Sequence, residues 1–365
     1  MKKAVFVGCL ILPALLVSGQ ALLKDGPLKG EWNFSPEKIW EAGQAGDEAF
    51  GRVAELLVLD DGSVFLRDFE KNVSYLFDKD GRFLKTFAPQ GKDDGQLPFY
   101  LNRFRAGGKI VLASPDKLHF FSRDGVFERA VENNLFLRFP LRFTSESEFI
   151  YAPNFPQSPV HEKILMSFDI ISGQGKTLVD FSKAAPDSGP VARGPMLMSF
   201  SLTPQVRFAS DEDKMAFGRS DQYEIFIADQ AGSILTSFRL DRKRMTASLE
   251  DKRRQVAGTR LPEEQKEKVV AQLPDEMTYF SHIEMIKGRI YVFAVDRVGE
   301  KTDSQQVDIF SSQGEYLYRG RIEFGDGLEF GSPSNLVITD GHAYVILEDG
   351  QGRRTLAKYA IKLPL

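Results

Sequence analysis

Short runs in which apolar and polar residues alternate follow one another along most of the chain, and turns containing glycine separate them. Alternation with a period of two is typical of β-strands, and Asp-Gly, Gly-Gly or Lys-Gly turns supply the positive φ that tight hairpins require. The clearest pair of runs is YLFDKDGRFLKTF at 75–87, followed by HFFSRDGVFERAV at 119–131. Another hairpin of the same kind precedes each of them. The pattern therefore predicts units of four antiparallel strands, a to d.

The second hairpin of this unit recurs through the chain. Looser copies occupy 166–181, 225–238 and 307–322, and a last copy begins at 356–359 and meets the C-terminus before its second strand. Four-stranded units that repeat every ~40–50 residues are typical of propeller blades. Most steps between copies fit this length, and two longer steps indicate insertions. The predicted fold class is therefore all-β, a six-bladed β-propeller of four-stranded antiparallel blades.

The two ends of the chain are complementary. The last repeat lacks strand d, and an unassigned strand-like segment lies within 31–41, where Trp32, Phe34, Ile39 and Trp40 are found. A strand d supplied from the N-terminus would close the ring and remove its open edge. We therefore expect residues 20–365 to form one closed propeller.

The longest step between repeats contains a polar insertion at 241–277. Residues 246–256 and 262–272 are predicted to form two polar helices. The second has a favourable start, because Pro262 is followed by two glutamates, a composition that suits a first helical turn. Their apolar stripe is narrow. The insertion, placed between the fourth and fifth blades, is expected to be either a lid or partner-docking arm, or a solvated helical hairpin packed on the rim.

The opening residues of the first two blades carry a family resemblance. Lys38-Ile39-Trp40 is followed by a glycine-containing stretch to Phe50, and a second opening reads QGKDDGQLP at 90–98. These segments resemble the NHL-repeat type of six-bladed propeller. Resemblance to that group implies a scaffold, a ligand-binding domain or an enzyme such as a lyase or lactonase. In the similar enzymes, convergent histidines or carboxylates hold a metal at the central channel. The fold alone does not choose among these activities.

The first residues indicate export. Lys2 and Lys3 precede an apolar run to Leu16, and small residues at 17–19 suit cleavage before Gln20, so residues 1–19 are predicted to be a signal peptide. The run is too short to span a bilayer. Cys9, the only cysteine, is poorly placed for lipidation. We expect a periplasmic or secreted protein, with a lipoprotein as the weaker alternative. A net charge of −4 argues against nucleic acid as a partner.

Loop lengths point to one end of the ring. In a blade, the b–c and d–a loops share a face, and the long irregular segments 153–160, 182–204, 242–277 and 296–305 are all of these two kinds. Long loops gathered on one face of a rigid scaffold usually mark its working face. A protein, peptide or glycan ligand is expected there. The candidate contacts are charged residues where b strands end: Arg67, Asp68, Arg219, Asp296, Arg297, Glu348 and Asp349.

Catalysis is the alternative. His119, His161, His282 and His342 are scattered over four blades without the short spacing typical of metal sites. His161 and His282 would both approach the working face, with Asp296 and Glu348 nearby, and could serve a metal-assisted lyase or lactonase. The preferred hypothesis is a non-catalytic binding module without a metal or other cofactor. The sequence leaves the catalytic residues, the ligand and the oligomeric state open.

Overall fold

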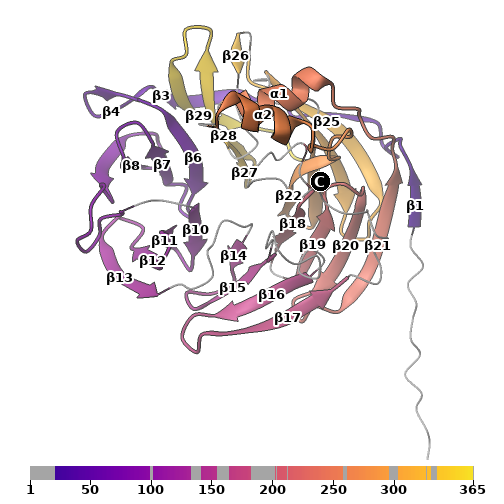
Figure 1. Ribbon diagram of the computed structural model, residues 1–365, viewed down its shortest axis with the longest axis horizontal. Helices are drawn as coiled ribbons and strands as arrows, with labels where there is room; N and C mark the ends of the chain where they lie inside the picture. The colour runs from indigo at the N-terminus through magenta and orange to yellow at the C-terminus, as the bar shows by residue number, and fades with distance from the viewer. Residues whose placement is uncertain are drawn as a thin grey trace, which may run out of the picture.

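In the computed structural model of the protein, six antiparallel sheets stand around a common axis as the blades of a propeller (Figure 1). The structure describes residues 21–98, 102–132, 141–153, 164–181, 202, 204–211, 213–257, 261–295, 303–325, 327–329 and 335–364. The predicted signal peptide lies outside these residues. The predicted all-β fold is confirmed, including the number of blades and the helical insertion.

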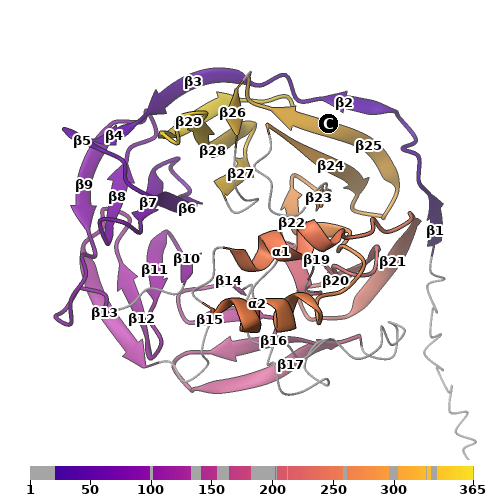
Figure 2. The same ribbon diagram turned by 45° about the horizontal axis from the view of Figure 1, so that its top comes forward.

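Within each blade, consecutive strands pair antiparallel, and strand a lies nearest the axis (Figure 2). The first three blades are β6 (Val53–Val58), β7 (Val64–Asp68), β8 (Val73–Phe77) and β9 (Phe83–Phe87); β10 (Asn102–Ala106), β11 (Lys109–Ala113), β12 (Lys117–Phe121) and β13 (Phe127–Glu132); and β14 (Leu141–Phe143), β15 (Glu148–Tyr151), β16 (Ile164–Asp169) and β17 (Gln174–Asp180).

The other three blades complete the ring. They are β18 (Val206–Ser210), β19 (Lys214–Arg219), β20 (Glu224–Asp229) and β21 (Ile234–Asp241); β22 (Phe280–Ile286), β23 (Arg289–Ala294), β24 (Ser304–Ser311) and β25 (Tyr316–Glu323); and β27 (Leu336–Thr339), β28 (His342–Asp349), β29 (Arg354–Ala360) and β3 (Glu37–Ala42). Short strands β26 (Leu328–Glu329), β4 (Gln44–Ala45) and β5 (Glu48–Ala49) lie between these elements. The hairpins predicted from the repeats coincide with strands c and d.

The N-terminal segment closes the ring as predicted. Strand β3 pairs antiparallel with β29, so it is strand d of the sixth blade. Trp40 on β3 donates a hydrogen bond from its indole N–H to the carbonyl of Lys79 in the first blade, at 3.0 Å. Its ring lies so close to Gly81 that a Cβ there would be 2.6 Å from Cδ2 of Trp40. Strand β3 therefore completes the sheet of the sixth blade, and its Trp40 side chain contacts the first blade.

The same segment also covers two other blades, which the sequence did not predict. Strand β1 (Ala21–Lys24) pairs parallel with β21, and β2 (Glu31–Asn33) pairs parallel with β25. Each adds a fifth strand to the outside of its blade. Residues 21–42, which we call the belt, thus follow the outer edges of blades 4, 5 and 6 in turn (Figure 2).

A buried carboxylate fastens the belt to blades 4 and 5. Asp308 on β24 is fully buried and accepts hydrogen bonds from the hydroxyls of Tyr223 and Tyr316. Arg242 donates to both of its carboxylate oxygens, at 2.7 and 3.2 Å, and Arg319 donates at 3.3 Å. Both arginines also donate to Asp25 of the belt. We call these six residues the rim hub. Since its charges are paired on all sides, the hub holds two blades and the belt in one arrangement.

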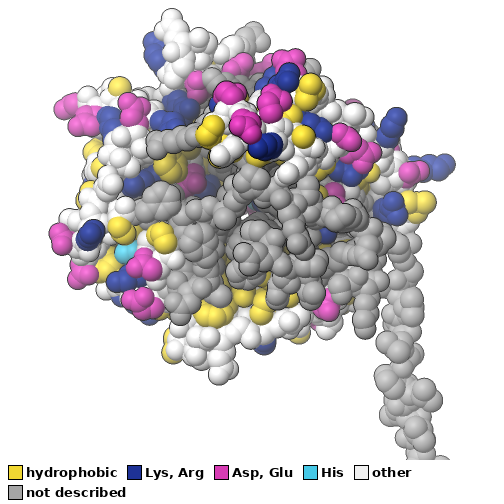
Figure 3. All heavy atoms as spheres, in the orientation of Figure 1, with side chains coloured by type: hydrophobic (Ala, Val, Ile, Leu, Met, Phe, Trp, Pro, Cys, Tyr) yellow, Lys and Arg dark blue, Asp and Glu magenta, His cyan; other side chains and the backbone are white. Residues whose placement is uncertain are grey.

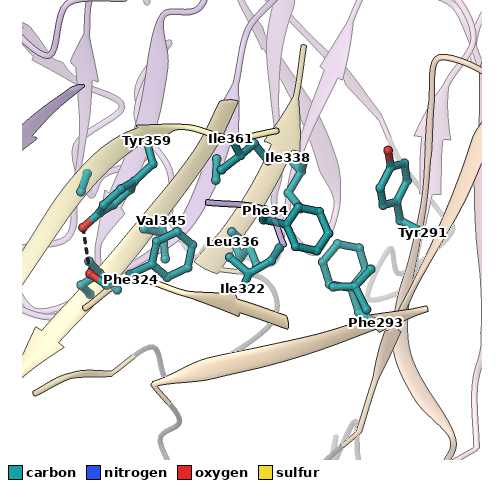
Figure 4. Packing of buried hydrophobic residues seen from close by; sticks show 14 of the residues in the cluster. Phe34, Tyr291, Phe293, Ile322, Phe324, Leu336, Ile338, Val345, Tyr359 and Ile361 are labelled. Carbon is teal, nitrogen blue, oxygen red and sulfur yellow. Dashed lines mark hydrogen bonds between the residues drawn. The ribbon is translucent and has the colours of Figure 1, made fainter. Parts of the chain in front are cut away.

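Aromatic and aliphatic side chains fill the space between blades. Figure 4 shows the cluster between blades 5 and 6, in which Phe34 from the belt packs near Phe293 and Ile338. Between blades 1 and 2, Phe87 contacts Phe65 and Phe121 at ring-centroid distances of 5.8 and 5.3 Å. Burial of each such side chain contributes about 1.5–3 kcal/mol to folding. The recurrent phenylalanines therefore fill the spaces between the sheets.

The insertion forms two helices, α1 (Leu249–Ala257) and α2 (Glu263–Val270), between β21 and β22. They pack on each other through Val256, Val269 and Val270, a small cluster separate from the blade cores. A bridge between Thr246 and Glu276 joins the two ends of the insertion. Figures 1 and 2 show both helices in front of one face of the ring. Among the described residues, none of the helices combines the length and apolarity needed to cross a membrane.

Candidate functional site on the inner strands

Charged side chains alternate with buried apolar ones on the innermost strands. On β10, Phe104 and Ala106 are buried while Arg103 and Arg105 keep some exposure. On β22, Ile283 and Met285 are buried while His282 and Glu284 keep some exposure. Because successive side chains on a strand point to opposite sides, one set enters the core and the other is left for the solvent near the axis.

A short hydrogen bond links two of these side chains on blade 5. Nε2 of His282 lies 2.7 Å from Oε1 of Glu284, and the two side chains are 37% and 27% exposed. Burial raises the pKa of Glu284, but His282, Arg142 and Arg105 oppose it, and together they hold the pKa below its ordinary value. Glu284 is therefore ionised at neutral pH.

The partners of Glu284 come from other blades. Arg142 lies on β14 of blade 3, and Arg105 lies on β10 of blade 2, opposite β22 in the ring. Burial lowers the pKa of Arg142, and Arg105 lowers it further, whereas Glu284 and Asp211 oppose this effect. All four groups lie on the first strands of their blades, which are nearest the axis (Figure 2). We call Arg105, Arg142, His282 and Glu284 the axial cluster.

The neighbouring arginines differ in how they are paired. Arg105 forms a 2.7 Å ion pair with Asp60 of blade 1. Arg103 donates to the carbonyl of Leu56 from Nε and Nη2, at 3.2 and 3.1 Å. Arg142 has neither a hydrogen bond nor an ion pair with any residue that the structure describes. It is the one member of the cluster whose donors are unused there.

Three of the predicted contact residues are buried at the ends of b strands. Asp68 is fully buried and accepts from the backbone N–H groups of Gly51, Glu70 and Lys71 at 2.8–3.1 Å. Arg67 donates to the Ser74 hydroxyl and the Ala88 carbonyl. Arg219 forms a two-bond pair with Asp221. Each of these three candidate contacts is occupied by bonds inside the protein, and their role as ligand contacts stays a prediction.

Two predicted contacts keep partial exposure. Glu348 and Asp349 end β28 of blade 6 and pair with Arg354 and Arg353, at 3.0 and 2.7 Å. Asp296 and Arg297 lie outside the described residues, as does His161. The described candidate contacts thus come from three blades: Arg67 and Asp68 from blade 1, Arg219 from blade 4, and Glu348 and Asp349 from blade 6.

The other histidines have separate environments. His119 on β12 is buried, with Nε2 lying 3.2 Å from the Ser114 hydroxyl. His342 begins β28, directly after an a–b turn. Of the three histidines that the structure describes, only His282 belongs to the axial cluster. Within the described residues, no three histidine, cysteine or acidic side chains converge as metal ligands would.

Arg105, Arg142 and Glu284 were not predicted from the sequence. Arginines 103 and 105 on either side of a buried phenylalanine, and the His-Ile-Glu-Met run at 282–285, place polar residues on every second position of strand a. In a propeller, strand a lies nearest the axis. That combination was the available signal for a charged axial site.

Comparison with solved structures supports the fold. A member of the DUF4221 family from Bacteroides vulgatus aligns over 90% of this chain and 98% of its own, with a TM-score of 0.57 and 12% identity. A Bacteroides fragilis protein, named as a proposed exported protein, aligns over 94% of this chain and all of its own, with a TM-score of 0.53 and 13% identity. Such identities show a shared propeller fold and no shared activity.

The other comparisons with known proteins indicate no function for this chain. No protein-family model and no curated protein matches the chain. A virginiamycin B lyase from Staphylococcus aureus aligns with a TM-score of only 0.41 and 13% identity. The six-bladed arrangement implied by the resemblance to NHL-repeat propellers is confirmed, and membership of that type stays a prediction.

Proposed function

We propose that this protein is an exported, non-catalytic binding propeller that engages a protein, peptide or glycan through the face carrying its b–c and d–a loops. The observation that carries the proposal is the unequal length of the connections. The a–b turns are short at 107–108, 287–288 and 340–341, whereas long segments join β17 to β18 and β21 to β22. A rigid ring with variable segments on one face is the usual design of a binding scaffold.

The helical insertion strengthens this proposal. Its base packs on the ring through Ala247 and Met277, which contact Leu202 and Val295. Beyond that base, the helices display intermingled acidic and basic side chains (Figure 3), including the Arg253–Glu267 pair. A polar arm with its own small core, attached at one point of the loop-bearing face, is suited to touch a bound macromolecule.

The test compares charge reversals on the two faces. Asp349 and Asp78 are matched, because each accepts hydrogen bonds from the backbone N–H groups two and four residues ahead. Asp349 lies in a b–c turn and Asp78 in a c–d turn on the other face. The labelled mature protein, from Gln20 onward, is applied to peptide and glycan arrays. Asp349→Lys, Asp296→Lys and Arg297→Glu should weaken the strongest signal about tenfold or more, while Asp78→Lys should not.

Two results would overturn the proposal. If both faces respond equally, or every signal survives the reversals, then the loop-bearing face is not the contact surface. If the protein, dialysed without chelator, retains about one calcium or zinc ion per chain, then metal-assisted catalysis becomes the better explanation.

A further inference from the structure

The belt consists of two parts that contribute differently to the ring. Strand β3 is strand d of the sixth blade, so it is needed for closure. Strands β1 and β2 lie outside blades 4 and 5, and each of these blades has four strands without them (Figure 2). We call residues 21–34 the strap. Removing the strap from the outer edges would therefore leave blades 4 and 5 with four strands each and the ring closed.

The surface that receives the strap is fitted to its side chains. Gly320 on β25 is the register partner of Trp32, and a Cβ at Gly320 would lie 2.5 Å from Cε2 of Phe34. The indole N–H of Trp32 donates to the carbonyl of Lys362, and the backbone N–H of Lys362 donates to the carbonyl of Phe34, both at 2.8 Å. Phe34 is fully buried. This surface therefore fits the strap of any copy of the chain, whichever copy supplies it.

A charged contact adds to the fit. Asp25 of the strap accepts hydrogen bonds from Arg242, at 2.8 and 3.1 Å, and from Arg319. If the strap leaves, Arg242 and Arg319 still donate to Asp308 but lose their second carboxylate. Charge-assisted hydrogen bonds of this kind are among the stronger ones in proteins. A ring without its strap therefore attracts the strap of a second copy by the same contacts as its own.

The hinge between β2 and β3 is short and strained. Only residues 34–36 separate the two strands. Ser35 has a φ of 44°, which a residue other than glycine adopts only at a cost in energy. Pro36 follows it, and a residue before a proline favours an extended backbone. An extended hinge would remove this strain, and short hinges under strain favour exchange of the segment they carry.

We propose that two copies of this protein exchange their straps, so that residues 21–34 of each copy dock on blades 4 and 5 of the other. This exchange is independent of the proposed binding function. The contacts between strap and ring are the same in both forms, so the hinge and the protein concentration decide between them. A tethered strap competes at an effective concentration on the order of 1 mM, and exchanged dimers are therefore expected at about 0.1–1 mM protein.

Disulfide trapping tests the exchange. Cys9 is the only cysteine, so the protein from Gln20 onward contains none. Lys24 and Asp241 are exposed register partners on β1 and β21. Paired strands lie about 4.8 Å apart, a separation that a disulfide can bridge. Lys24→Cys and Asp241→Cys are made as separate proteins that differ in mass by a tag, mixed at about 1 mM and oxidised.

A non-reducing gel measures the linked heterodimer. The mixture should give about tenfold more of it than a mixture of Lys24→Cys with Leu84→Cys, because only exchange holds two thiols together. Leu84 is an exposed residue on the outer strand of blade 1, so this control measures random collision.

A hinge variant identifies the cause of the exchange. Glycine adopts a positive φ without strain. Ser35→Gly, introduced into both cysteine proteins, should therefore lower the yield of linked heterodimer about fivefold. Ser172→Gly, in an exposed turn of blade 3, is the matched control and should leave the yield unchanged.

The double variant Lys24→Cys/Asp241→Cys, oxidised at low concentration, shows whether the two thiols can pair within one chain. If this internal disulfide forms while the heterodimer does not exceed the collision control, straps are not exchanged and the inference is overturned. It is also overturned if the internal disulfide does not form, because the strap is then not paired with blade 4. A heterodimer yield that Ser35→Gly leaves unchanged would overturn the role of the hinge.

Discussion

The rim hub and the axial cluster are built from similar charged residues, but they differ in how many of their donors and acceptors form hydrogen bonds within the described part of the chain. In the hub, both oxygens of Asp308 are occupied, and Arg242 and Arg319 each contact two carboxylates. In the axial cluster, Arg142 has unused donors among the described residues and Glu284 has an unused acceptor. A fully satisfied buried polar network makes the surrounding structure rigid and specifies one arrangement.

Their positions in the fold explain this difference. The hub lies where two blades and the belt meet, so polar groups from three segments can reach one carboxylate. The axial residues come from three inner strands, β10, β14 and β22, each of which belongs to a different blade.

The largest expected effect is on the hub. Asp308→Ala would leave two tyrosine hydroxyls and two arginines without their shared acceptor, and should lower the free energy of unfolding by about 3–5 kcal/mol. Glu284→Gln, at a partly exposed position, should lower it by no more than about 1 kcal/mol. Urea unfolding followed by circular dichroism measures both. Equal losses would show that the rim hub contributes no more to stability than the axial cluster does.

The belt residue Asp25 gives a smaller, pH-dependent effect. Burial raises its pKa, but Arg242 and Arg319 outweigh that and lower it below 3.8. The stabilisation is therefore complete above pH 3.8 and is lost as the pH falls below it. Asp25→Asn should cost about 1 kcal/mol at neutral pH, after allowance for partial exposure.

Unfolding of wild type and Asp25→Asn at several pH values checks this. The difference between them should shrink below about pH 4, because protonated Asp25 loses its charge-assisted bonds. A constant difference down to about pH 2 would mean that the charge of Asp25 does not fasten the belt.

The ring was predictable because its determinants are local and repeated. Turns such as Asp80-Gly81 and the aromatic residues of strands c specify each hairpin, and the missing last strand indicates closure from the N-terminus. The parallel pairing of β1 and β2 was not predictable, since it depends on the outer edges of blades that are distant in sequence.

The site was less predictable for a related reason. Charged residues at b-strand ends suggested an exposed rim, but Asp68 caps backbone N–H groups of its own blade and Arg219 pairs with Asp221 two residues away. Whether a charge is used internally depends on contacts that sequence spacing does not reveal. The axial cluster depends on side chains from blades 2, 3 and 5 meeting near the axis, which appears only in the assembled ring.

The partly buried charge of Arg142 is expected to lower the free energy of unfolding. The Arg142 guanidinium is partly buried, and its donors have no partner among the residues that the structure describes. An apolar side chain of similar length in its place would remove the desolvation cost. Arg142→Met should therefore raise the free energy of unfolding by about 0.5–1 kcal/mol. Arg105→Met, which breaks the pair with Asp60, should lower it instead. If Arg142→Met is as destabilising as Arg105→Met, Arg142 is a structural residue.

The smallest effect is expected for the helical insertion. Its cluster of Val256, Val269 and Val270 is separate from the blade cores, whereas Ala247 and Met277 pack on the ring. Replacing residues 249–274 with a short Gly-Ser linker keeps those two contacts and should change the unfolding free energy of the ring by less than about 0.5 kcal/mol. Array binding should weaken if the insertion touches the macromolecular ligand. A large loss of ring stability would instead show that the helices are part of the scaffold, and would remove them from the proposed contact surface.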